Sequence, residues 1–94
     1  MRIATIPARR PSSIADWLVD RVAEHLDMPA RDIDTSLPLA ELGIDSVGAV
    51  SLVGEVEDEW ELDVDPTMIF DYPTIDDIAV FIADEIAATY ERAS

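Results

Sequence analysis

The sequence predicts an all-α fold, a small four-helix bundle of three longer helices and one short third helix, with a long loop between helices 1 and 2. Apolar residues recur every three or four positions in three separate segments, which is the period of one helical face. No segment alternates as a half-buried strand does, and no internal repeat is visible. Because 94 residues suffice for one hydrophobic core but not for two, we expect a single domain.

The first helix is predicted to run from Ser13 to about Asp27. Ser13 and Asp16 are placed as an N-terminal cap pair, and Met28-Pro29 ends the helix because proline lacks an amide and restricts the residue before it. The apolar residues of this segment have the spacing of one helical face: Ile14, Trp17, Leu18, Val22 and Leu26.

Residues 28–44 are predicted to form the long loop, because two prolines and scattered acids interrupt any helical pattern. Loops of this length without structure of their own are usually functional. Four aliphatic side chains would pin the loop to the core: Ile33, Leu37, Leu39 and Leu42.

The second helix is predicted to begin at Asp45-Ser46, two residue types that cap helices well. Its apolar residues continue at helical spacing: Val47, Val50, Val53, Val56 and Trp60. Gly48 and Gly54 each lower the intrinsic helix propensity by about 1 kcal/mol relative to alanine. We therefore expect packing or partner contact to explain both glycines, as contact points where a small residue is needed.

A brief third helix and a long last helix complete the bundle. The third is predicted over residues 65–70, where Asp65 supplies an acidic cap and Pro66 stands at a first helical position. Thr74 and Asp77 resemble a capping box at the start of the last helix. A regular apolar stripe follows in that helix: Ile75, Ile78, Ala79, Ile82, Ile86 and Tyr90.

The charge of the chain is strongly negative and unevenly placed. The formal net charge is −15, from 21 acidic residues and six arginines. Residues 1–11 hold three of the arginines and no acid, lack a periodic pattern, and are predicted to be a flexible N-terminal arm. The domain proper, residues 12–94, then carries −18, which argues against nucleic acid and membrane partners and favours proteins with basic patches. Acids that only keep a small domain soluble are the alternative.

The residues that could carry chemistry do not make an enzyme. The chain has no cysteine and one histidine, His25, whereas a serine hydrolase needs a base beside its nucleophile. The residues around Ser46 also lack the leading glycine of a nucleophile elbow. The acidic pairs Asp32-x-Asp34 and Asp63-x-Asp65 do not fit a calcium-binding loop, so no metal site is predicted.

The most specific feature is the segment 42–47, in which a glycine-containing turn delivers Ser46 to the start of a helix. Unpaired amides and the helix dipole favour a phosphate at that position, by roughly 0.3–1 kcal/mol when it is exposed. The neighbouring carboxylate of Asp45 would repel a phosphate, so it must serve another purpose, either capping the helix or being recognised by the modifying enzyme. On these residues alone, a plain capping serine remains the alternative.

Residues 43–47, Gly-Ile-Asp-Ser-Val, resemble the signature of acyl carrier proteins, in which the serine of the Asp-Ser pair receives 4′-phosphopantetheine. Residues 66–75 resemble the segment that leads into the last helix in carrier domains of modular polyketide synthases. The resemblance covers about residues 13–88 and implies that Ser46 is the attachment site. An acidic residue before the serine, rather than the histidine typical of peptidyl carriers, favours an acyl cargo.

The sequence shows no secretory signal and no membrane span, so we expect a cytoplasmic protein. The resemblance implies a carrier, expected to be a monomer, that is not itself an enzyme but a covalently loaded substrate of other enzymes in polyketide or antibiotic biosynthesis. Its partners would be a phosphopantetheinyl transferase, an acyltransferase or acyl-loading ligase, and a ketosynthase or other polyketide synthase domains. The initial methionine favours a discrete protein. We expect six residues to contact partners: Asp45, Val47, Gly48, Glu55, Glu57 and Met68. An acidic helical adaptor for a basic protein is the alternative function.

Overall fold

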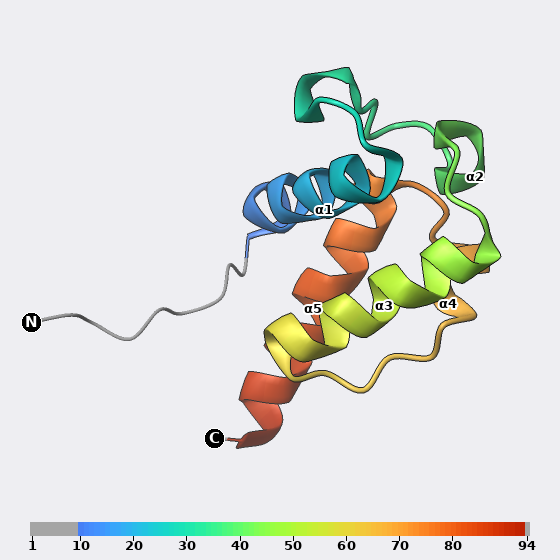
Figure 1. Ribbon diagram of the computed structural model, residues 1–94. Helices are drawn as coiled ribbons and strands as arrows, with labels where there is room; N and C mark the ends of the chain where they lie inside the picture. The colour runs from blue at the N-terminus through green and yellow to red at the C-terminus, as the bar shows by residue number, and fades with distance from the viewer. Residues whose placement is uncertain (1–9, 94) are drawn as a thin grey trace, which may run out of the picture.

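Three long helices and three short helical segments make up the computed structural model, which describes residues 10–93 (Figure 1). Their bounds are Pro11–Leu26 (α1), Ala30–Asp32 (η1, a 3-10 turn), Leu39–Leu42 (α2), Ser46–Trp60 (α3), Met68–Asp71 (α4) and Ile75–Ala93 (α5). The all-helical class is confirmed, as are the three longer helices and the short helix before the last one. The predicted arm over residues 1–11 lies outside the described residues apart from Arg10 and Pro11.

Helix α1 begins two residues earlier than predicted. Arg10 is its N-terminal cap residue and Pro11 its first helical residue, a position where the missing proline amide has no intrahelical partner to lose. The predicted cap pair Ser13 and Asp16 is therefore wrong. The helix ends at Leu26, and Asp27 adopts the left-handed conformation with φ 54°, so the chain turns before it reaches proline.

The connection between α1 and α3 contains the two short segments η1 and α2, where the sequence predicted a loop without helices. Backbone hydrogen bonds fasten it to the start of α5: the Leu39 amide donates to Pro73 O at 2.9 Å, and the Asp76 amide donates to Thr35 O at 3.1 Å. Of the predicted anchors, Ile33 and Leu39 are buried and Leu42 is partly buried. Leu37 is 36% exposed, so its predicted role as an anchor is wrong.

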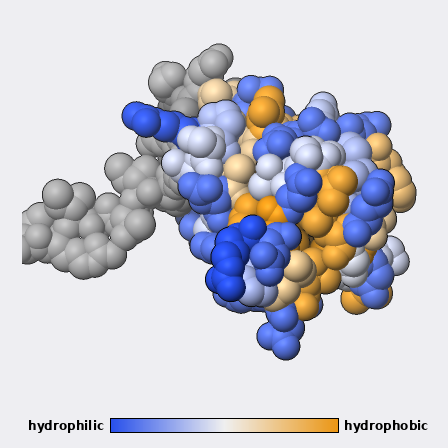
Figure 2. All heavy atoms as spheres, turned by 90° about the horizontal axis from the view of Figure 1, so that it is seen from above, coloured by the Kyte–Doolittle hydropathy of each residue, from blue (hydrophilic) through white to orange (hydrophobic). Residues whose placement is uncertain are grey.

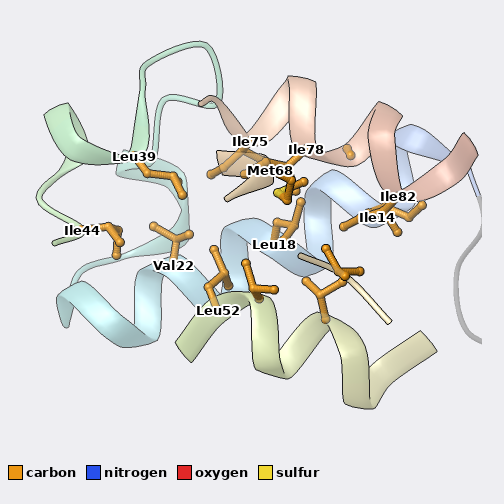
Figure 3. Packing of buried hydrophobic residues seen from close by; sticks show 14 of the residues in the cluster. Ile14, Leu18, Val22, Leu39, Ile44, Leu52, Met68, Ile75, Ile78 and Ile82 are labelled. Atoms are coloured by element: carbon orange, nitrogen blue, oxygen red, sulfur yellow. The ribbon is translucent and has the colours of Figure 1, made fainter. Parts of the chain in front are cut away.

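The core lies between α1, α3 and α5, and its side chains point toward one another in Figure 3. Its members include Ile14, Leu18 and Val22 of α1, Leu52, Val53 and Val56 of α3, and Ile75, Ile78, Ala79, Ile82 and Ile86 of α5. Trp17 of α1 packs edge to face against Trp60 of α3, with ring centroids 4.7 Å apart. The predicted stripe of α5 is confirmed up to Ile86, while the side chain of Tyr90 lies outside the described residues.

The turns before α4 and α5 are held by side-chain caps. Asp65 Oδ1 accepts hydrogen bonds from the Thr67 amide at 2.9 Å and from the Thr67 hydroxyl at 2.8 Å, and α4 starts only at Met68, later than predicted. Thr74 Oγ1 accepts from the Asp77 amide at 3.0 Å, as the sequence predicted. Among residues 10–93 no helix is long and apolar enough to cross a membrane.

Candidate functional site

The start of α3 is capped by Asp45, not by Ser46. Asp45 has extended backbone angles, and its Oδ1 accepts a hydrogen bond from the Gly48 amide at 2.8 Å. Ser46 is consequently the first residue inside the helix. The capping serine that the sequence left as an alternative is thus ruled out, because the neighbouring carboxylate already performs that role.

The turn before α3 explains how the chain reaches Ser46. Gly43 has φ +112°, a left-handed angle that other residues rarely adopt, and its amide donates to Leu39 O at 3.2 Å. A Cβ on Gly43 would also come within 3.3 Å of Leu26 Cδ2, so the turn packs closely against the end of α1. The next side chain, Ile44, is buried. With Ile44 fixed in the core, the chain emerges at the surface at Asp45 and Ser46, which are both exposed.

The Ser46 hydroxyl is exposed, and no hydrogen bond engages it in the part of the chain that the structure describes. It lies at a helix N-terminus, where the first amides have no intrahelical acceptor and the helix dipole is positive. A phosphate ester on this oxygen would be favoured by both. The Ser46 hydroxyl is therefore accessible to a modifying enzyme and is not needed for a structural hydrogen bond.

Two hollows flank the start of α3. The apolar hollow, about 330 Å³ in volume, lies between α2, α3 and α4; Ser46 is on its wall together with Ile44, Ala49, Val50, Ile69 and Phe70. A more polar hollow of about 310 Å³ lies on the side of α1 and is lined by residues that include His25, Asp45 and Ser51. Ser46 therefore borders an apolar surface that is open to solvent.

Of the six residues predicted to contact partners, Asp45 and Val47 are exposed beside Ser46, and Gly48 is partly covered. Gly48 lies where a Cβ would come within 3.2 Å of Ile44 Cγ2, so it is a close-contact position as predicted. At Gly54, by contrast, a Cβ would meet nothing within 4 Å, so packing within the domain does not explain this glycine.

The other three predicted contact residues are engaged inside the domain. Glu55 Oε1 lies 3.0 Å from His25 Nε2, so this carboxylate faces α1. Glu57 Oε2 accepts a hydrogen bond from the Val64 amide at 2.9 Å and holds the connection that follows α3. Met68 is 7% exposed and packs in the core, so its predicted place at the docking surface is wrong.

Sequence reasoning missed the exposure of Val50 and Phe70. Val50 was placed on the apolar stripe of α3, yet it is exposed, as is Val47, and Leu52, Val53 and Val56 fill the core instead. The signal was present in the sequence, because Leu52 and Val56 define a face that Val47 and Val50 do not share. Phe70 carried no such signal, since a helix of four residues is too short to show a period.

His25 and the acidic residues form no metal site or catalytic pair in the described part of the chain. Residues 10–93 contain no group of three or more histidine, cysteine or acidic side chains close enough to hold a metal ion. The ring of His25 is bound to Glu55, 30 positions along the chain, and makes no hydrogen bond to Ser46.

Comparison with known proteins agrees with this geometry. Residues 16–82 match the family described as "Phosphopantetheine attachment site". The chain is 39% identical over 64 residues to polyketide synthase PksL of Bacillus subtilis, a match that covers 68% of this chain and 1% of that protein. The chain spans only a small part of the length of the polyketide synthases that it matches.

Solved structures of carrier proteins have the same fold. A free-standing peptidyl carrier protein from Acinetobacter baumannii superposes with a TM-score of 0.80 at 28% identity, covering 84% of this chain and 99% of that one. Acyl carrier protein LipD from Actinoplanes friuliensis gives a TM-score of 0.71 at 38% identity, covering 93% of this chain and 99% of that one.

Proposed function

The chain belongs to the family of phosphopantetheine-attachment carrier domains, and we propose that Ser46 is the residue that carries the phosphopantetheine arm. One observation carries this proposal: Asp45 caps α3, so the exposed hydroxyl of Ser46 is left without a structural role. The matched family range includes Ser46. The adaptor alternative gives no reason for a free hydroxyl at the start of this helix.

In the proposed attachment, the Ser46 oxygen forms a new ester bond to the phosphorus of coenzyme A that bears the pantetheine. The bond from that phosphorus to the nucleotide breaks, the nucleotide leaves with the electron pair, and the serine proton passes to a base of the transferase. The attached arm supplies a terminal thiol that holds an acyl group as a thioester. The chain has no cysteine, so it contains no competing thiol of its own.

The backbone and side chains around Ser46 would stabilise and position the attached group. The first amides of α3 and the positive end of its helix dipole would favour the negative charge of a phosphodiester on Ser46. Asp45 accepts the hydrogen bond from the Gly48 amide and so holds the helix start in one conformation, and an arm on Ser46 would be attached at a fixed point. A flexible phosphopantetheine arm on the folded domain would raise the local concentration of the bound acyl group at each enzyme that the domain contacts in the cytoplasm.

We propose that the cargo is an acyl intermediate of polyketide synthesis. Support comes from the similarity to PksL and to LipD, and from the acidic residue before Ser46. The enzymes that would exchange cargo with the arm are an acyltransferase or acyl-loading ligase and a ketosynthase. Their contact with this acidic domain would be fast to form and to dissociate, as electrostatically steered contacts are.

The test is incubation with a broad-specificity phosphopantetheinyl transferase, coenzyme A and magnesium, followed by mass spectrometry of the intact protein. Wild type should gain the mass of one phosphopantetheine, and Ser46→Ala should gain none. Ser51→Ala is the matched control, because Ser51 is an exposed serine on the same helix, and it should be modified like wild type. Modification of Ser46→Ala, or a folded wild type that stays unmodified, would overturn the assignment.

A further inference from the structure

Three apolar side chains next to Ser46 remain exposed although the core is otherwise well filled. Val47 is 76% exposed, Val50 55% and Phe70 85%. Val50 and Phe70 line the same apolar hollow as Ser46, and Val47 follows Ser46 directly in α3. We call Val47, Val50 and Phe70 the apolar rim.

Folding does not account for the apolar rim. The buried face of α3 is formed by other residues, Leu52, Val53 and Val56, and the core side of α4 is supplied by Met68. Phe70 is the most exposed large hydrophobic side chain in the described part of the chain. Single exposed apolar residues need no explanation, but these residues gather around one proposed reaction site, which is typical of an interaction surface. On the face seen from above in Figure 2, apolar surface lies among largely hydrophilic surface.

The charge of the domain decides what can cover this rim. Two copies of a domain with a formal charge of −18 over residues 12–94 would repel each other, and an anionic membrane would be repelled as well. Asp45 and Asp71 are exposed next to the rim in sequence, each adjacent to Ser46 or Phe70. A partner surface that fits must therefore be apolar where it meets Phe70 and positively charged around that point.

We infer that Phe70 is the apolar anchor by which the enzymes acting on Ser46 hold this domain, and that it enters an apolar socket bordered by arginine or lysine side chains. The inference rests on the proposed attachment at Ser46. Aromatic side chains suit this task, since they bury a large area on binding while losing few rotatable bonds. Residues of this kind at the centre of an interface contribute most of the binding free energy, and the surrounding acids set the association rate.

A competing use of Phe70 is to shield the cargo, because the apolar hollow could receive part of an acyl group. The two uses separate in the unmodified protein, which carries neither arm nor cargo. In a Phe70 variant that keeps the wild-type fold, a change in the first modification reaction reports contact with the transferase, because no cargo is present to be shielded. The decisive measurement is therefore kcat/KM for phosphopantetheine transfer from coenzyme A to the unmodified protein.

Phe70→Ala should lower kcat/KM at least about tenfold, as removal of an interface anchor does. Phe70→Leu keeps an apolar side chain and should retain most of the rate. Val80→Ala is the matched control, because Val80 is 51% exposed on α5 and lines neither hollow beside Ser46. It should leave kcat/KM unchanged. Circular dichroism of each variant should show the wild-type unfolding temperature, since Phe70 and Val80 are both largely exposed.

The same assay at increasing sodium chloride tests the charged border of the socket. The wild-type kcat/KM should fall as salt screens the attraction, and the remaining Phe70→Ala rate should fall in parallel. Equal rates for Phe70→Ala and Val80→Ala, or a wild-type rate independent of salt, would overturn the inference while leaving attachment at Ser46 intact. A normal transfer rate combined with faster hydrolysis of a loaded thioester in Phe70→Ala would assign the residue to cargo instead. Absence of any modification of wild type would refute the proposed function itself.

Discussion

Alanine substitutions at the two glycines of α3 should have clearly different effects on stability. At Gly54 an added Cβ meets nothing within 4 Å, so Gly54→Ala changes only the helix propensity. Alanine is favoured over glycine in a helix interior by about 1 kcal/mol. For a domain of this size, that gain corresponds to a rise in Tm of roughly 4–8 °C.

At Gly48 the same substitution brings a Cβ within 3.2 Å of Ile44 Cγ2 and 3.3 Å of Asp45 Oδ1. Ile44 is buried and has little room to move, and Asp45 Oδ1 is the atom that caps α3. Weakening that cap costs about 1 kcal/mol, which cancels the gain in helix propensity. Gly48→Ala should therefore leave stability unchanged or lower it.

Thermal and urea unfolding followed by circular dichroism measure both differences directly. Phosphopantetheine transfer provides a second observable, because a displaced Asp45 also displaces Ser46 next to it. Gly48→Ala should be modified more slowly than wild type, and Gly54→Ala at the wild-type rate. A Gly48→Ala variant that gains as much stability as Gly54→Ala would refute the reasoning from close contact.

Two further predictions concern side chains that hold the connection between α3 and α5. Glu57→Ala leaves the Val64 amide without its acceptor and should destabilise the domain by about 1–3 kcal/mol. Glu57→Gln keeps an acceptor and should cost less. In urea unfolding, a loss of stability in Glu57→Ala no larger than that in Asp58→Ala, a variant of an exposed residue, would contradict this role. Hydrogen bonds from the Thr67 amide and hydroxyl lower the pKa of Asp65. Its stabilising effect is therefore complete above the unfolded pKa of about 3.9 and is lost as the pH falls through the lower folded pKa, so Tm measured against pH should decline less in acid for Asp65→Asn than for wild type.

Long helices with a regular stripe could be predicted well from the sequence, and short ones could not. The stripe that begins at Ile75 identified α5 because nearly every member packs in the core. The segments η1 and α2 have three and four residues, too few to show a period. Tertiary bonds, such as that from the Leu39 amide to Pro73 O, hold them instead, and a local pattern does not reveal such bonds.

The position of the candidate site followed from local residues, but its surroundings did not. Ser46 could be located because the turn at Gly43 and the cap at Asp45 lie within three positions of it. The roles of Glu55 and Glu57 depend on partners 30 and seven positions away. From the sequence alone, an acidic residue in a helix is expected to be solvent-exposed, whether it faces a partner protein or a neighbouring segment of its own chain. Glu55 and Glu57 were therefore both predicted to contact partners.

Stability and partner recognition use different parts of this domain. The extensive packing between α1 and α5 and the buried face of α3 hold the fold together, while the apolar rim contributes little to it because its side chains remain in water. Changes at Val47, Val50 or Phe70 can therefore alter which enzymes bind without much effect on folding. Acids such as Glu55 and Glu57, which couple α3 to its neighbours, do not have this freedom, so we expect partner specificity to be set at the rim.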